Sequence, residues 1–176
     1  DLPDIPLDRA QLSAVLPGYP GRDPGESDAA HRFRRERDAA HLDGLLPEGP
    51  GRRRHLREIH AYILGIALTH HEPDAAPFVI WEGSHEVIRA MLRAHLPHDP
   101  ADWGAVDLTE PYQAARREVF ETCRRVELPA AFGTGYVAHR LSIHGTAPWR
   151  AGDAPQRLIA YFRPDAPDPL DWLAAP

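Results

Sequence analysis

Proline and glycine divide this chain into short segments, and this spacing limits what it can fold into. The 176 residues include 19 prolines and 13 glycines, which gather in stretches such as 16–25, 45–51 and 97–111. Short apolar runs lie between these stretches, and their length is typical of strands buried on both faces. Several short strands joined by tight turns, with two helices added, predict a closed or nearly closed β architecture.

The runs of apolar residues predict where the strands lie. The expected strands are 61–69, 78–81, 136–144 and 157–163. An extended segment around His41 and Asp43 should precede them. The stretch 45–51 contains proline and glycine and is expected to form a turn or a loop beside the site.

Two segments show helical periodicity. One is expected to begin with Ser84 as its capping residue and to run to about Leu96, before a proline. The other covers 112–125, with Pro111 in its first turn. A proline-rich tail should follow the last strand and be held against the domain by Trp172.

Composition excludes several classes of function. A length of 176 residues suits one domain, and no apolar run approaches the roughly 20 residues that span a bilayer. The formal charge of -6 does not favour a nucleic-acid partner, and we interpret the basic clusters 34–35 and 52–54 as solvated surface in preference to anion-binding sites. A lone cysteine, Cys123, excludes an intramolecular disulfide and suits a reducing, cytoplasmic compartment. The first four residues show no signal peptide.

A metal site is indicated by His41-Leu42-Asp43, because residues two apart in a strand project from the same face. The third ligand must come from elsewhere, and the best candidate is His144, with His139 as its competitor. Two histidines and one carboxylate form the ligand set that non-heme Fe(II) uses.

The last predicted strand carries a second signal. Alternation places Arg157 and Arg163 on one face, and an arginine that points inward needs an anionic partner. A dicarboxylate co-substrate would supply that partner through a bidentate contact with the guanidinium.

Four pieces of the sequence occur together in a recognisable order. They are 41–43, 76–85, 144–149 and the strand that begins at Arg157. In these pieces, which span about residues 38–163, the chain resembles the phytanoyl-CoA dioxygenase family of Fe(II)/2-oxoglutarate-dependent oxygenases. The resemblance implies a mainly β fold with flanking helices, the double-stranded β-helix or jelly roll of the cupin type. It implies a single oxygenase domain over 1–176, with an arm at 1–37, a barrel core at 38–163 and a tail at 164–176.

The resemblance also implies a role for each site residue. Fe(II) would be held by His41, Asp43 and His144, where the His-Gly-Thr-Ala-Pro string favours His144 over His139. The far carboxylate of 2-oxoglutarate would be held by Arg157 and Thr146, with Arg163 as the alternative to Arg157. His85 is not carried over as a ligand.

The implied activity is a dioxygenase that uses O2 to hydroxylate a small organic or acyl substrate, with release of succinate and CO2. Halogenation is not expected, because Asp43 occupies the position that halogenating relatives leave open. Two alternatives stay open: a cupin-type metalloenzyme that does not use 2-oxoglutarate, and a catalytically silent binding protein on the same barrel. The expected partner is a small molecule, and neither a nucleic acid nor a membrane is expected.

Overall fold

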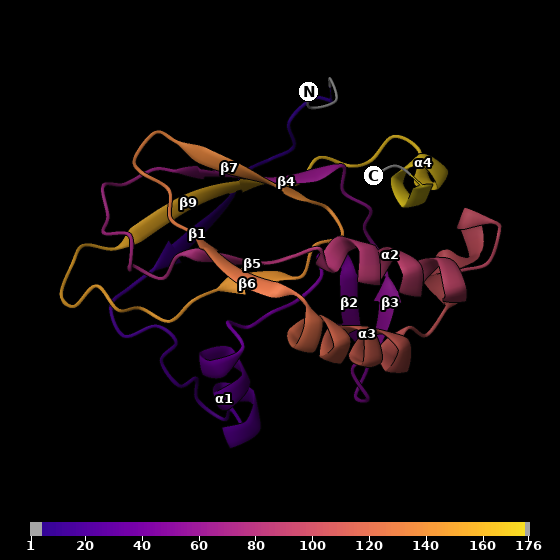
Figure 1. The fold of residues 1–176 in the computed structure, drawn as a ribbon, viewed down its shortest axis with the longest axis horizontal. Helices are drawn as coiled ribbons and strands as arrows, with labels where there is room; N and C mark the ends of the chain where they lie inside the picture. The colour runs from indigo at the N-terminus through magenta and orange to yellow at the C-terminus, as the bar shows by residue number, and fades with distance from the viewer. Residues whose placement is uncertain (1–4, 175–176) are drawn as a thin grey trace.

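The computed structural model describes residues 5–174 as a mainly antiparallel β protein with few helices (Figure 1). The strands are β1 (Gln11–Val15), β2 (Leu45–Glu48), β3 (Arg53–Leu56), β4 (Tyr62–Ala67), β5 (Phe78–Glu82), β6 (Arg124–Leu128), β7 (Gly135–His139), β8 (His144–Thr146) and β9 (Arg157–Phe162). The helices are α1 (Asp28–Glu36), α2 (Ser84–His95), α3 (Thr109–Thr122), α4 (Pro169–Ala174) and a 3-10 helix, η1 (Pro100–Ala105). Within residues 5–174, no helix is long and apolar enough to cross a membrane. The expectation about a signal peptide concerns residues 1–4, which lie outside the described residues.

Two antiparallel sheets form two layers (Figure 1). One has the strand order β1-β9-β4-β7 and the other the order β6-β5-β8. Their inner faces pack together, since the ring of Phe78 on β5 lies 4.6 Å from the ring of Tyr136 and 6.1 Å from that of Tyr161. Apolar side chains such as Ile63 and Ile159 fill the space between the sheets. The core of the molecule is therefore a sandwich of two sheets.

Strand β5 shows how one sequence serves two interfaces. Phe78 and Ile80 point into the space between the sheets, while Val79 and Trp81 point to the opposite face. There, α2, α3 and the hairpin β2–β3 cover them with a second apolar cluster. The helices therefore flank the three-stranded sheet, as Figure 1 shows.

The prediction of one strand over 136–144 is wrong. Strand β7 ends at His139 in the four-stranded sheet, and β8 begins at His144 in the three-stranded sheet. Between them the chain turns, and His139 holds the turn: its Nδ1 accepts from the Leu141 N–H at 3.0 Å and its carbonyl from the Ser142 N–H at 2.9 Å. The chain thus crosses from one layer to the other within this stretch.

Other elements also differ from the expectation. The stretch 45–51 is not a simple loop, because residues 45–48 form one strand of the hairpin β2–β3. Helix α3 begins three residues earlier than expected, and residues 124–128 form β6 instead of continuing the helix. Strand β1 and helix α1 were not expected, and β1 pairs with β9 along its whole length.

Helix α2 ends where expected, with Leu96 as its C-cap, but Ser84 does not cap it. Gly83 is the N-cap residue, and the Ser84 hydroxyl instead accepts a hydrogen bond from the Ile143 N–H at 2.9 Å. The tail behaves as predicted within the described residues, because Trp172 is buried and its Nε1–H donates to the His60 carbonyl at 3.0 Å.

Gly145 is a point where the fold tolerates no side chain. A Cβ at this position would lie 2.1 Å from the backbone oxygen of Asp38. We expect Gly145→Ala to lower the free energy of unfolding by about 1–3 kcal/mol, because the two segments must move apart. Urea unfolding measures this change.

Gly21→Ala is the matched control, since nothing lies within 4 Å of a Cβ there. It should stay within about 0.5 kcal/mol of the wild type. Equal losses in the two variants would contradict the close approach at Gly145.

Candidate metal centre

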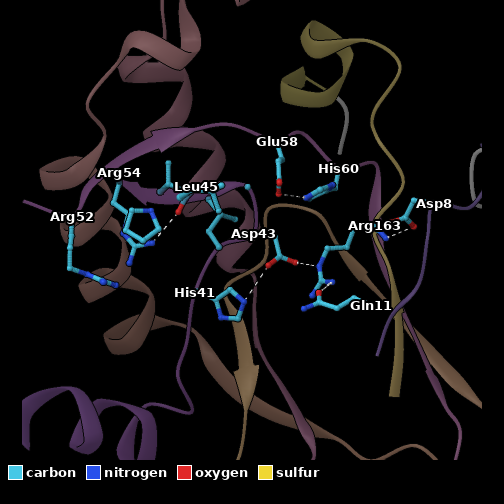
Figure 2. Close-up of a pocket in the computed structure, with 14 residues that line it drawn as sticks. Asp8, Gln11, His41, Asp43, Leu45, Arg52, Arg54, Glu58, His60 and Arg163 are labelled. Atoms are coloured by element: carbon cyan, nitrogen blue, oxygen red, sulfur yellow. Dashed lines mark hydrogen bonds and ion pairs between the residues drawn. The ribbon is translucent and has the colours of Figure 1, made fainter. Parts of the chain in front are cut away.

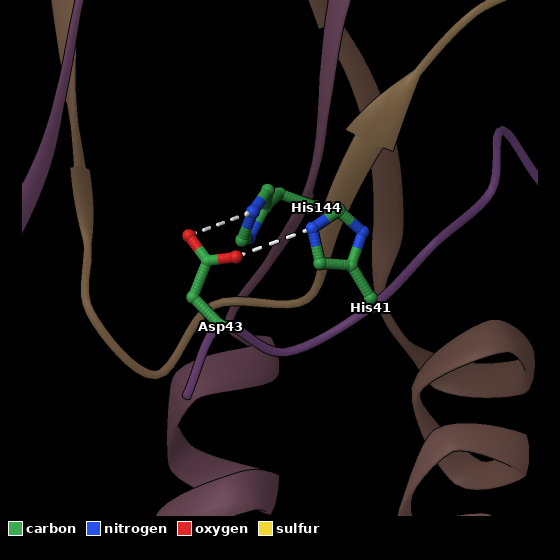
Figure 3. Close-up of side chains that lie close together, drawn as sticks. All are labelled: His41, Asp43 and His144. Atoms are coloured by element: carbon green, nitrogen blue, oxygen red, sulfur yellow. Dashed lines mark ion pairs between the residues drawn. The ribbon is translucent and has the colours of Figure 1, made fainter. Parts of the chain in front are cut away.

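The structure brings together His41, Asp43 and His144, the three residues predicted as metal ligands. One potential ligand atom from each lies within 4.8 Å of the others. The carboxylate of Asp43 faces both imidazoles, with 3.2 Å from its Oδ1 to the His41 Nε2 and 3.4 Å from its Oδ2 to the His144 Nε2 (Figure 3). A cluster of this composition could hold a metal ion.

A backbone bridge places the two histidines side by side. The His41 N–H donates to the His144 carbonyl at 2.9 Å, and the His144 N–H donates to the His41 carbonyl at 3.1 Å. The ring centroids are consequently 4.5 Å apart. Only this single bridge is formed, so the expected strand through His41 and Asp43 is wrong. Asp43 lies in a turn, and Gly44 follows it with φ +78°, a conformation that favours glycine.

The segment before His41 is held under backbone strain. Asp38 and Ala39 both have φ +53°, in the left-handed region that residues with a Cβ rarely adopt. Arg125 on β6 compensates by donating to both carboxylate oxygens of the buried Asp38, at 2.7 and 2.8 Å. The Asp38 carbonyl also accepts from the Thr146 N–H at 2.8 Å, so this segment is fastened to β8.

A buried tyrosine holds the residue between the first two ligands. The Leu42 N–H donates to the Tyr112 hydroxyl at 3.1 Å, and the Leu42 side chain packs in the apolar cluster under α3. Because Leu42 is fixed on one side, the side chains of His41 and Asp43 are directed to the other. Helix α3 therefore supports the candidate metal centre without contributing one of its three side chains.

The hydrogen bonds of the imidazoles define their tautomers. The His41 Nδ1 lies 3.0 Å from the Ala39 carbonyl, and the His144 Nδ1 lies 2.9 Å from the Ser142 carbonyl. Since a carbonyl only accepts, each Nδ1 carries a hydrogen, and in the neutral form of each ring Nε2 presents a lone pair. The Nε2 of His144 is buried and has no hydrogen-bond partner among the described residues. Two lone pairs and a carboxylate thus face one another, and a cation between them would remove the repulsion.

The protonation states agree with this picture. Burial lowers the pKa of His144, and the neighbouring His41 ring lowers it further, so His144 is neutral at pH 7. Burial alone would raise the pKa of Asp43, but the net shift is downward, and the hydrogen bond that Arg163 donates to Oδ2 also favours the ionised carboxylate. A neutral imidazole and an ionised carboxylate are the forms that bind a metal.

Two cavities reach this centre. The outer cavity, of about 490 Å³, is lined by His41 and Asp43 and by polar residues of the hairpin (Figure 2). The inner cavity, of about 200 Å³, is lined by His41, His144, Thr146 and Tyr161 among others. Arg163 lines both, and its Nε donates to Asp43 Oδ2 at 2.5 Å.

Of the two residues predicted to bind 2-oxoglutarate, one lines a cavity beside the metal centre and the other does not. Thr146 lines the inner cavity next to His144. Arg157 shares a face of β9 with Tyr161, is 2% exposed, and lines neither cavity. Its Nε and Nη2 are buried without a hydrogen-bond partner in the described part of the chain. Arg163, the alternative, is engaged by Asp43 and Gln11.

The competitor histidine lies elsewhere. The ring of His139 is 4.6 Å from that of His85, and its Nε2 is 3.1 Å from an Arg89 nitrogen. It is not part of the His41, Asp43 and His144 cluster. Sequence reasoning missed Asp38, Tyr112 and Arg125, which no local motif marks.

Comparisons with known proteins add little to this geometry. No protein-family model matches the chain, and no curated protein matches it closely enough to indicate a relative. Among solved structures, the chain is similar to the crystal structure of EvdMO1, with 18% identical residues and a TM-score of 0.43 over 92% of this chain. It spans only 28% of the length of that chain. At this level of identity and superposition, a shared activity does not follow.

The ligand assignment predicts a contrast between two histidines. His144→Ala should abolish binding of Fe(II) under anaerobic conditions, because it removes the buried nitrogen of the cluster. His139→Ala should leave binding unchanged, because its ring lies outside the cluster. Equilibrium dialysis with metal analysis measures both, and the reverse result would overturn the assignment.

The support given by Arg125 predicts a second contrast. Arg125→Gln leaves the buried Asp38 carboxylate without its bidentate partner and should lower the free energy of unfolding by about 1–3 kcal/mol. Arg124→Gln removes an exposed pair with Glu82 and should cost less than about 1 kcal/mol. Both values come from urea unfolding, and metal affinity should fall only in the first variant.

Proposed function

We propose that this protein is a non-heme Fe(II)- and 2-oxoglutarate-dependent dioxygenase that hydroxylates a small organic or acyl substrate, with release of succinate and CO2. The observation that carries the proposal is the convergence of His41, Asp43 and His144, with the Nε2 atoms of both imidazoles facing the carboxylate. Two imidazole nitrogens and one carboxylate oxygen are the donor set of mononuclear Fe(II) oxygenases. When bound, Fe(II) with 2-oxoglutarate and O2 supplies the oxidising chemistry.

We also propose that the fold is a double-stranded β-helix. Two antiparallel sheets packed face to face support this, as does the crossing of the chain from one sheet to the other between β7 and β8. The metal ligands would then lie at one end of the space between the sheets, as the stacking of His144 on Phe78 at 5.4 Å indicates.

Arg157 supports the co-substrate assignment. A buried guanidinium without a partner is costly, and a carboxylate that accepts two hydrogen bonds from it would offset that cost. The far carboxylate of 2-oxoglutarate is such a group, and Thr146 would add a hydroxyl to it from the inner cavity. Arg163 is less suited, because Asp43 and Gln11 already occupy it.

The other residues of the inner cavity would orient the co-substrate and shield it from water. Phe78 and Tyr161 form apolar walls, and the Tyr161 hydroxyl is 2.6 Å from that of Tyr136. Burial is the largest cause that raises the pKa of Tyr136, so this hydroxyl stays protonated at neutral pH. The Tyr136 side chain therefore brings no charge into the space between the sheets.

The proposal is tested by an anaerobic titration of the Fe(II)-loaded protein with 2-oxoglutarate. A weak visible absorption band should appear as the keto acid chelates the metal, and Arg157→Gln should weaken its formation at least tenfold. Arg150→Gln, which alters only exposed ion pairs with Asp74 and Glu127, is the control and should have no effect. Iron binding without the band would point to a metalloenzyme that does not use 2-oxoglutarate.

A stability measurement separates a ligand-binding role of Arg157 from a structural one. Because its Nε and Nη2 have no partner in the described chain, Arg157→Gln should leave the free energy of unfolding unchanged or raised in the absence of 2-oxoglutarate. An arginine with a structural role would give a marked loss of stability in urea unfolding. Loss of the band only in Arg163→Gln would move the assignment to Arg163.

A further inference from the structure

Three arginines gather beside the metal centre without a carboxylate partner. Arg54 lies 5.8 Å and Arg116 lies 5.3 Å from the centroid of the Tyr112 ring, measured from each guanidinium carbon. Arg52 and Arg54 line one cavity with Arg116, so the three share one space. None of them forms an ion pair in the part of the chain that the structure describes, although acidic residues outnumber basic ones by 26 to 20.

Arg53, the neighbour of Arg52 and Arg54 in the sequence, does have a carboxylate partner. Arg53 lies between Arg52 and Arg54 in the sequence, but its side chain pairs with Asp107 at 3.3 Å. Arg54 in β3 and Arg52 in the turn before it both line the two cavities, whereas Arg53 lines neither of them. The interpretation of 52–54 as solvated surface agrees with the exposure of Arg52 and Arg53, whereas Arg54 is half-buried in a cavity wall.

Two of these arginines line the same cavity as two residues of the candidate metal centre. Arg52 and Arg54 line the outer cavity together with His41 and Asp43, and Figure 2 shows them across that cavity from Asp43. They also line the adjoining cavity of about 190 Å³ that contains Arg116. A molecule in the outer cavity could thus contact the arginines at one end and approach the metal ligands at the other.

The half-buried guanidinium of Arg54 lies in an electrostatically unfavourable place without an anion. Burial lowers the pKa of Arg54, and repulsion from Arg116 and Arg52 acts in the same direction, against an opposing effect of Tyr112. Within residues 5–174, the Arg54 guanidinium donates only to the Leu45 carbonyl, at 3.0 Å, and this oxygen carries no full charge. An anionic oxygen group bound by several guanidinium donors would neutralise this concentration of charge.

We propose that Arg52, Arg54 and Arg116 bind an anionic group, a phosphate or a carboxylate, of the substrate. The substrate is accordingly a small organic anion whose uncharged part lies in the outer cavity, along Leu46 and Pro47, toward His41 and Asp43. This assignment of a substrate class rests on the proposed dioxygenase function, whereas anion binding by the three arginines does not.

The experiment uses metal-free full-length protein and two probes, inorganic phosphate and acetate. Arginine side-chain Nε–H signals are followed by NMR during each titration, at constant ionic strength set with sodium chloride. Phosphate should shift these signals saturably, and Arg52→Gln and Arg54→Gln should each weaken binding at least fivefold. Arg53→Gln is the control: it removes one positive charge from the residue between Arg52 and Arg54 and should leave the affinity for phosphate unchanged. Phosphate bound more tightly than acetate would indicate a phosphorylated substrate, and the opposite order a carboxylate.

Two outcomes would overturn the proposal. One is the absence of a saturable shift with either probe. The other is equal weakening by Arg53→Gln and Arg52→Gln, which would show only diffuse attraction by a basic surface. Arg52→Gln is decisive if Arg54→Gln loosens the hairpin, because Arg54 also bonds to Leu45 and no such bond is described for Arg52.

The 2-oxoglutarate titration described above separates the two proposals. If phosphate binds as expected but the absorption band is absent, the dioxygenase fails and the anion site stands. If the band forms but neither probe binds, the anion site fails and the dioxygenase stands.

Discussion

The reciprocal hydrogen bonds between His41 and His144 join two parts of the chain that are far apart in sequence, and the candidate site depends on them. They set the distance between the two imidazoles directly, since both rings project from bridged residues. Three neighbouring residues support this contact. Gly145 permits the close approach of the two segments, Arg125 binds the strained segment before His41, and Tyr112 accepts a hydrogen bond from Leu42. The site is therefore assembled by backbone pairing and buried polar contacts more than by the ligands themselves.

Local sequence patterns predicted which side chains converge better than they predicted the backbone that carries them. The spacing of His41 and Asp43 correctly placed both side chains in one space, although the expected strand is a single bridge followed by a turn. Apolar content alone could not show that 136–144 divides between two sheets, because His139 makes the turn through its own side chain and carbonyl. The hairpin β2–β3 was missed because Pro47 and the glycines after it resemble a loop.

The residues that support the site, Asp38, Arg125 and Tyr112, could not be predicted for a different reason. Asp38 and Arg125 meet only after β6 has paired with β5, and Tyr112 reaches Leu42 only after α3 has packed against the sheet. Such contacts depend on tertiary structure, and a single sequence carries no periodicity or spacing that marks them. For Arg157 the case is intermediate. Alternation along the last strand placed Arg157 and Arg163 on one face, and the family resemblance selected Arg157, but the buried Nε and Nη2 of Arg157, unpartnered within residues 5–174, could be seen only in the structure.

The buried Nε2 of His144 and the buried guanidinium of Arg157 have one further consequence. In the folded chain alone, the His144 lone pair and the Arg157 guanidinium are both buried without a partner among the described residues, which is unfavourable. A cation would satisfy the His144 nitrogen, and an anion would satisfy the guanidinium. Ligands that bind the native state and not the unfolded chain shift the folding equilibrium by mass action. For this protein, the supply of a cation and of a small organic anion would then set the fraction of folded molecules as well as the occupancy of the site.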